Sequence, residues 1–402
     1  MPTPKQKLIL RICCSVHVLH DGAVDMLYAL LPLLREAFGL TYAEVALVRS
    51  VHRFATALFE IPVGILAEKL GARNLLVAGT VLVGIAFLGL GFANGFAAIL
   101  AFIFLAGCGA AVQHPLASSI ISNTFPGAGQ RAALGTYNAF GDVGKFTFLG
   151  LTLLSTTVFG FSWHVPVHGF SIVAVIVAGI AFIFLTLANT DERQDPLSKH
   201  DLKDTVKSWG IKHQRGFYTL GTIAALDSST RSGFLTFVAF LMIEKGVVTE
   251  LAATAVLATT FGGMCGKYAV GLIAEKIGIA RTIMLTEIAT AGLIILVILL
   301  PSVAAFFLLP LLGVFLNGTS SAIYGSVADF IEGEKHSRAY ALIYTLGSAC
   351  GLFAPLLYGL LADMSGITTA LAVVSIVVLL TVPLCGILAT ALREAKENAL
   401  GA

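Results

Sequence analysis

The amino-acid sequence predicts an all-α polytopic membrane protein. Of its 402 residues, 57% are hydrophobic and only 12% are charged, whereas an ordinary soluble domain has roughly 25% charged residues. The mean hydropathy of +0.90 leaves too little polar surface for a water-soluble fold. A formal net charge of +2 gives no reason to expect a polyanionic partner such as nucleic acid.

Twelve stretches are long and apolar enough to be membrane spans, and we expect them to form two bundles of six helices. A hydrocarbon core about 30 Å thick is crossed by roughly 20 helical residues. The predicted spans cover residues 11–35, 43–67, 74–93, 97–123, 132–158, 166–188, 216–243, 250–274, 281–300, 302–328, 338–361 and 367–391.

Basic residues outside the spans indicate the orientation. If both ends of the chain lie inside, the inner segments hold most of them, including Lys69, Arg131 and Lys335. The outer segments then hold only Arg35 and Lys245. Because cytoplasmic loops carry an excess of Lys and Arg, this bias predicts cytoplasmic termini.

The longest polar stretch, residues 189–215, divides the chain into an N-terminal bundle (1–188) and a C-terminal bundle (216–402). Apolar residues within it fall near one helical face, with lysines interleaved. Two interpretations remain open: an amphipathic helix on the inner leaflet and a solvated linker.

The two predicted bundles share an internal repeat. The segment from Gly64 to Gly71, GILAEKLG, recurs 207 residues later from Gly271 to Gly278 as GLIAEKIG. Parallel repeats of this kind usually bind substrate between the halves, near the bilayer midplane.

The repeated loop resembles the signature of the major facilitator superfamily between helices 2 and 3. Glu68 replaces the usual Asp, and Ala72 replaces one usual base. The resemblance implies secondary transport by alternating access, with the loop as a latch, and peripheral positions for spans 3, 6, 9 and 12. We expect the first glycine to permit close helix approach. The predicted gating residues in these loops are Gly64, Glu68, Arg73, Gly271, Glu275 and Arg281.

The first predicted span carries the densest group of ionisable side chains. His17, Asp21 and Asp25 recur every four residues and share one helical stripe, with His20 beside them. Ionisable groups inside a span are costly and are functional candidates by default. Two acids and two histidines without a base among them predict a proton-coupling site, and Arg53 on the second span is the expected counter-charge.

Other polar residues within the spans are candidates for substrate binding, each with a structural alternative. Asp142 with Lys145 and Asp227 with Arg231 can also close as ion pairs within their own helices, and His114 can satisfy a backbone carbonyl freed by Pro115. The asparagine and the tyrosine in the set can serve ordinary helix packing. The candidates are Arg49, Arg53, His114, Asp142, Lys145, Asp227, Arg231, Asn317 and Tyr344.

Three further charged residues lie toward the inner boundary, the acids Glu60 and Glu287 and the base Lys267. Glu60 and Lys267 occupy equivalent repeat positions, so they either form a cytoplasmic gate between the halves or pair locally. Glu287, on the ninth span, is close enough to the inner boundary to extend its side chain toward it.

Three segments of the first half resemble the fosmidomycin-resistance branch of the superfamily. They are HVLHD from His17 to Asp21, the glycine-rich run ending in His114-Pro115, and the glycine-rich stretch from Gly135 to Gly144. The resemblance implies proton-driven efflux, with His17, Asp21 and His114 in the cavity. His20 replaces the usual asparagine, which implies an altered substrate.

The sequence therefore predicts a proton-coupled exporter of a small polar or anionic molecule. An importer or facilitator of small organic anions is one alternative, and a transition-metal exporter with ligands on the first span is another. We expect no enzyme activity, no bound metal and no cofactor, because the proton gradient supplies the energy. The expected partners are protons, a small-molecule substrate and the bilayer, with the chain a monomer in the bacterial inner membrane.

Overall fold

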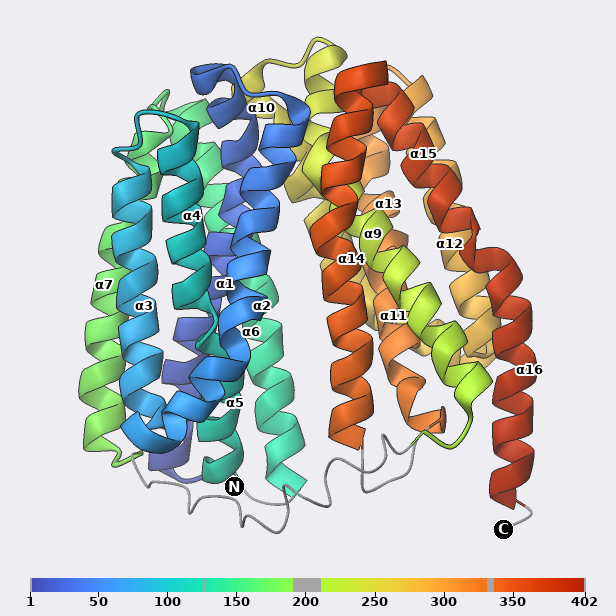
Figure 1. Ribbon diagram of the computed structural model, residues 1–402, viewed down its shortest axis with the longest axis horizontal. Coiled ribbons are helices and arrows are strands. Elements are labelled where there is room, and N and C mark those ends of the chain that lie inside the picture. The colour runs from blue at the N-terminus through green and yellow to red at the C-terminus, as the bar shows by residue number, and fades with distance from the viewer. Residues whose placement is uncertain (1, 126–127, 191–210, 331–335, 401–402) are drawn as a thin grey trace. The chain divides into compact units, whose positions relative to one another are not determined.

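The computed structural model describes residues 2–125, 128–190, 211–330 and 336–400, and its regular structure in these ranges is helical (Figure 1). The chain forms two compact units. Unit 1 comprises Met1–Leu40 and Leu47–Ser198, and unit 2 comprises Thr41–Ala46 and Lys199–Ala402. Most of the predicted linker and its possible amphipathic helix, residues 191–210, lies outside the described residues.

Unit 1 is built from the helices of the first six predicted spans. They are α1 (Pro4–Phe38), α2 (Tyr42–Leu70), whose first turn belongs to unit 2, α3 (Ala72–Leu90), α4 (Phe96–Ala110), α5 (Gln113–Thr124), α6 (Ala128–Leu153) with the π-helical turn η1 (Leu154–Val158), and α7 (His164–Leu187).

Unit 2 contains the helices of the remaining spans. They are α9 (Gln214–Glu244), α10 (Thr249–Ala252), α11 (Thr254–Ile277), α12 (Ile279–Leu299), α13 (Ser302–Gly325) with the 3-10 turn η2 (Val327–Phe330), α14 (His336–Ser365), α15 (Ile367–Leu379) and α16 (Thr381–Leu400).

Proline divides two spans that the sequence predicts as continuous. α4 ends and α5 begins around Ala111, four residues before Pro115, and α15 ends at Leu379, four residues before Pro383. A proline lacks the N–H that would bond the carbonyl four residues earlier, and its ring crowds that carbonyl. The first break lies just before His114, at the start of α5.

Eight helical stretches in the described part of the chain are long and apolar enough to cross a membrane. They begin at Ala72, Phe96, His164, Thr249, Ile279, Ser302, Thr345 and Ile367. The four other predicted spans correspond to α1, α2, α6 and α9, the helices that carry the mid-span acids and bases of the sequence analysis. The total of twelve spans therefore stays a prediction.

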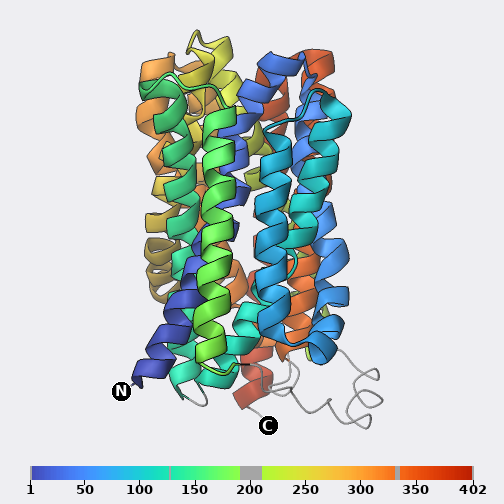
Figure 2. The same ribbon diagram turned by 90° about the vertical axis from the view of Figure 1, so that its left-hand side faces the viewer.

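The internal repeat is visible in equivalent hydrogen bonds. In unit 1, α7 packs against α3 (Figure 2), and the Ser171 hydroxyl donates to the Gly84 carbonyl at 2.7 Å. In unit 2, α15 packs against α12, and the Ser375 hydroxyl donates to the Ala291 carbonyl at 3.0 Å. Gly84 and Ala291 are separated by the repeat spacing, so corresponding helices are fastened by the same kind of bond.

The closest helix contact of unit 1 joins α1 and α6, not the repeated loop. A Cβ added at Gly144 would overlap the backbone carbonyl of Val18. By contrast, a Cβ at Gly64 or at Gly271 would meet no described atom within 4 Å. The close helix approach predicted at Gly64 is therefore wrong for this structure, because the loop glycines have open space beside them.

Gly144→Val should destabilise unit 1, because α6 must move away from α1 to admit the side chain. Overpacking of this kind costs about 1–3 kcal/mol. Thermal unfolding of the purified protein measures the effect. Gly135→Val on the same helix is the matched control, since a Cβ at Gly135 meets no described atom within 4 Å. Equal melting temperatures for the two variants would contradict the close contact.

Candidate functional site

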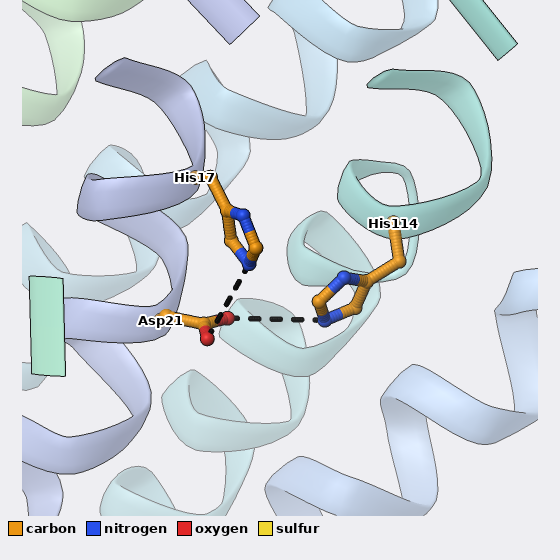
Figure 3. A group of neighbouring side chains, drawn as sticks. All are labelled: His17, Asp21 and His114. Atoms are coloured by element: carbon orange, nitrogen blue, oxygen red, sulfur yellow. Dashed lines mark ion pairs between the residues drawn. The ribbon is translucent and has the colours of Figure 1, made fainter. Parts of the chain in front are cut away.

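The candidate site lies where α1, α5 and α6 of unit 1 meet. Figure 3 shows His17 and Asp21 on α1 and His114 on α5, with the two imidazoles directed toward the Asp21 carboxylate. One Asp21 oxygen, Oδ2, lies 3.4 Å from His17 Nε2, and the other, Oδ1, lies 3.8 Å from His114 Nε2. The structure thus brings together three residues that the sequence places in two different spans.

Lys145 of α6 is the base at the centre of this site. Its ammonium lies 3.1 Å from Asp21 Oδ2 and 3.2 Å from Asp142 Oδ1, so one cation is shared by two carboxylates. The Asp21 side chain is 13% exposed and the Lys145 side chain is 29% exposed, so solvent screens the pair only partly. The ion pair predicted between Asp142 and Lys145 is present. Lys145 also contacts Asp21 from another helix, a pairing that the sequence does not predict.

His17 is held in one orientation by Tyr137. The imidazole Nδ1 lies 2.7 Å from the Tyr137 carbonyl oxygen, and the two rings are 4.1 Å apart between centroids. A carbonyl oxygen can only accept, so Nδ1 carries the hydrogen in this contact. Nε2 of a neutral His17 therefore presents a lone pair to the Asp21 carboxylate.

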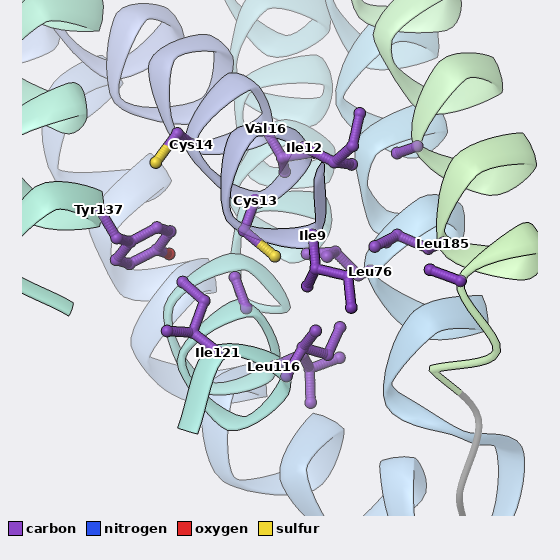
Figure 4. Close-up of a cluster of buried hydrophobic side chains, with 14 of the residues drawn as sticks. Ile9, Ile12, Cys13, Cys14, Val16, Leu76, Leu116, Ile121, Tyr137 and Leu185 are labelled. Carbon is purple, nitrogen blue, oxygen red and sulfur yellow. The ribbon is translucent and has the colours of Figure 1, made fainter. Parts of the chain in front are cut away.

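An apolar cluster that includes Tyr137 supports this arrangement (Figure 4). The Tyr137 ring is 1% exposed and belongs to the same cluster as Cys13, Leu116 and Ile121. The Gln113 side-chain amide donates to the Tyr137 hydroxyl. Because Tyr137 is fixed at both its ring and its hydroxyl, its carbonyl can hold the His17 ring.

Gly141 makes room for the site on α6. A Cβ at this position would lie 2.5 Å from His17 Nε2 and 2.8 Å from Asp21 Oδ2. Only a residue without a side chain allows α6 to pass this close to the two polar groups.

His20 and the arginines of α2 have other neighbours. His20 is buried, and its Nε2 lies 3.0 Å from the Thr80 hydroxyl on α3. Arg49 is 1% exposed, donates to the Tyr28 hydroxyl at 3.2 Å and lies over the Tyr28 ring. The charges of Lys145, Arg49 and Arg53 all act on the buried Asp25, and the role of Arg53 as the counter-charge stays a prediction.

The candidates of unit 2 form a separate group. Arg231 Nη1 lies 3.5 Å from Asp227 Oδ2, so this predicted ion pair is also present. Asn317 packs against Gly263, where a Cβ would overlap its side chain. The side chain of Tyr344 lies outside the described residues.

The predicted gating residues are only partly described. Glu60 is exposed in unit 1 and Lys267 is half-buried in unit 2, and their pairing stays a prediction. The Glu68 side chain lies outside the described residues. Arg73 donates to the Asn74 side chain at 3.2 Å, and Glu275 and Arg281 are exposed.

Sequence reasoning missed the neighbours that orient the site. The His17 partner is a backbone carbonyl, for which no residue type gives a signal. Thr80, Gln113 and Tyr28 are ordinary residues for a membrane helix, and only the packing of the helices makes them partners of His20, Tyr137 and Arg49.

His17, Asp21 and His114 also satisfy the distances of a metal site, since their ligating atoms all lie within 4.8 Å of one another. Nitrogen and oxygen donors of this kind suit transition metals. The Lys145 ammonium, 3.1 Å from Asp21, opposes a second cation at the same carboxylate.

Lys145→Met should destabilise the protein, because it leaves two partly buried carboxylates without their shared cation. We expect a loss of up to about 3 kcal/mol, the low end for a buried pair deprived of one partner. Thermal unfolding measures it, with Lys276→Met at an exposed position as the control. The double variant Lys145→Met/Asp21→Asn should recover part of the loss, and an additive double variant would contradict the pairing.

Comparison with known proteins identifies the family. The profile of the Major Facilitator Superfamily matches residues 13–312. The chain is 24% identical to an uncharacterized MFS-type transporter, YfnC, of Bacillus subtilis, over 95% of this chain and 91% of that protein. It is 20% identical to the hexuronate transporter of the same species, over 83% of each chain. It is also 23% identical to the probable sulfoacetate transporter SauU of Cupriavidus necator, over 89% of this chain and 88% of that one.

Solved structures give the same fold. The crystal structure of a bacterial homologue of the human lysosomal transporter Spinster, in an inward-facing and occupied conformation, has a TM-score of 0.72 at 18% identity and covers 99% of this chain and 98% of that one. The nucleoside transporter NupG has a TM-score of 0.71 at 14% identity, over 96% and 99%. The chain is an integral membrane protein and a transporter, not an enzyme, and it belongs to the major facilitator superfamily.

Proposed function

We propose that this protein couples the transport of a small organic anion to a proton, with Asp21 as the proton-binding group and Lys145 as the anion-binding group. The single observation that carries the proposal is the contact between His17 Nε2 and Asp21 Oδ2, at 3.4 Å. With Nδ1 bonded to the Tyr137 carbonyl, two hydrogen-bond acceptors face each other across this gap. A proton on either group converts the contact into a hydrogen bond, so the contact offers a place for a proton to bind.

Charge balance supports movement of the proton and the anion in the same direction. Three acids near the site are matched by three bases on the neighbouring helices. An anion that enters leaves one uncompensated negative charge in a membrane interior, where such a charge is expensive. A proton that enters with it restores neutrality. The acids are Asp21, Asp25 and Asp142, and the bases are Arg49, Arg53 and Lys145.

Proton binding and anion binding both involve the Lys145 ammonium. While Asp21 is ionised, its carboxylate lies 3.1 Å from Lys145. A proton on Asp21 cancels the charge that holds the ammonium, and a carboxylate or sulfonate of the substrate takes its place. Two relatives are a hexuronate transporter and a probable sulfoacetate transporter, and both of these solutes are anions of this kind.

Export in exchange for protons, which the resemblance to the fosmidomycin-resistance branch implies, is the second candidate. Such exchange requires the substrate and the proton to compete for Asp21. The histidines around that carboxylate favour this competition. Among substrates that would compete with a proton for Asp21, a transition metal is the one that His17, Asp21 and His114 suit best. In both schemes the chain acts as a monomer in the inner membrane with cytoplasmic termini and without a cofactor.

Proteoliposomes with an imposed pH gradient and an internal pH-sensitive dye test the proposal. Glucuronate, sulfoacetate, fosmidomycin and divalent metals form the solute panel. For the wild type we expect an anion to enter together with protons. Asp21→Asn imitates the protonated carboxyl, so it should exchange labelled anion for unlabelled anion while losing accumulation driven by the gradient.

Lys145→Met is the companion variant. It removes a charge-assisted contact worth about 1.5–3 kcal/mol, so anion binding should weaken about ten- to a hundredfold. Glu275→Gln, at an exposed position, is the control and should behave as wild type. Proton movement opposite to the solute would replace cotransport with exchange, and unchanged accumulation in Asp21→Asn would refute the role of Asp21.

A further inference from the structure

Glu287 of unit 2 has a place that the sequence does not predict. It lies on α12, and the sequence predicts that its side chain extends toward the inner boundary. Instead the residue is 1% exposed. Its neighbours along α12, Thr286 and Thr290, are 3% and 0% exposed, so a polar stripe of this helix faces the protein interior.

The Glu287 carboxyl is not satisfied as an ionised group. Its Oε1 atom is buried and has no hydrogen-bond partner among the described residues, and the same holds for the Thr290 hydroxyl one turn later. The Thr286 hydroxyl is already engaged, because it bonds the Thr282 carbonyl and accepts from Thr319 at 2.8 Å. A buried carboxylate oxygen without a hydrogen-bond partner is costly when the group is ionised. A protonated carboxyl, in contrast, is neutral and has an O–H to donate.

The charges around Glu287 lead to the same conclusion. Asp227 and Arg231 of α9 both act on it electrostatically, and Arg231 already pairs with Asp227 at 3.5 Å. One base therefore serves two acids, and a single bound proton makes the group neutral.

Other helices packed on α12 supply little further charge. α13 and α15 contain no acidic or basic residue. α16 contributes the thiol of Cys385 near Glu287, with Arg393, Glu394, Lys396 and Glu397 two or more turns beyond it. α11, which also contacts α12, carries Lys267, Glu275 and Lys276, and the latter two are exposed.

The internal repeat shows that the fold does not require an acid here. Thr80 on α3 occupies the equivalent position in unit 1, at the same spacing that relates Gly84 to Ala291. Thr80 is also fully buried, donates to the Leu76 carbonyl at 2.8 Å and meets His20. A neutral side chain thus suffices for packing at this position, and the carboxyl of Glu287 needs another reason.

We propose that Glu287 is a proton-binding site of unit 2, which holds its proton next to the Asp227–Arg231 pair. This site is separate from the proton coupling proposed at Asp21. Loss of the proton from Glu287 would make unit 2 sensitive to pH independently of Asp21. Its test needs no transported solute, so failure here and failure of the proposed function are distinguishable.

Infrared spectroscopy of the full-length protein in nanodiscs tests this site at neutral pH. We expect the carbonyl band of a protonated carboxyl, which moves to lower frequency in D2O. Biosynthetic incorporation of glutamate with a 13C carboxyl should shift the band further, whereas aspartate labelled in the same way should leave this component unchanged. Glu287→Gln should abolish it.

Two further variants serve as a substitute for Glu287→Gln and as a control. Glu287→Thr, which copies the residue of unit 1, should also fold and lack the band, and it serves if Glu287→Gln is unstable. Glu275→Gln is the matched change at an exposed site and should retain the band. A wild type without the glutamate component, a component that shifts only with labelled aspartate, or one that survives in both Glu287 variants would overturn the proposal.

Discussion

The ammonium of Lys145, held between the carboxylates of Asp21 and Asp142, is the interaction on which the first unit depends. Each acid alone in a membrane interior is expensive, and one cation contacts both of them. In the proposed function, a proton that enters with an anion releases this cation from Asp21, so that it can bind the anion. The orientation of His17, fixed by a backbone carbonyl, places a nitrogen acceptor beside the Asp21 carboxylate.

Small residues make this cluster geometrically possible. Gly144 brings α6 against the backbone of α1, and Gly141, one turn away, leaves space for the polar groups themselves. The break between α4 and α5, which Pro115 explains, lies immediately before His114. Glycine contacts, a proline break and the apolar cluster around Tyr137 thus act together to hold the charged groups close to one another.

Much of the fold can be predicted from the sequence. Long apolar stretches predict the helices within a few residues, and the repeat predicts two related halves, which the equivalent bonds from Ser171 and Ser375 support. The ion pairs within single helices, Asp142 with Lys145 and Asp227 with Arg231, follow from their spacing alone.

Contacts between helices could not be predicted in the same way. The sequence places Lys145 far from Asp21, and only the packing of α6 on α1 shows that the acids of α1 have a base among them. His20 is adjacent to Asp21 in sequence, yet it turns to Thr80 because successive residues leave a helix on different faces. For Glu287, the sequence indicates that the residue lies near a span boundary, but it does not indicate that the side chain is buried.

The most direct test of the account is to count the protons taken up when an anion binds. The purified protein, in weakly buffered detergent solution with a pH indicator, is mixed with a saturating amount of glucuronate or sulfoacetate, whichever the transport panel identifies. The account predicts uptake of about one proton per bound anion by the wild type and none by Asp21→Asn, as linkage between the two sites requires. Proton release on binding, or equal uptake by both proteins, would contradict it.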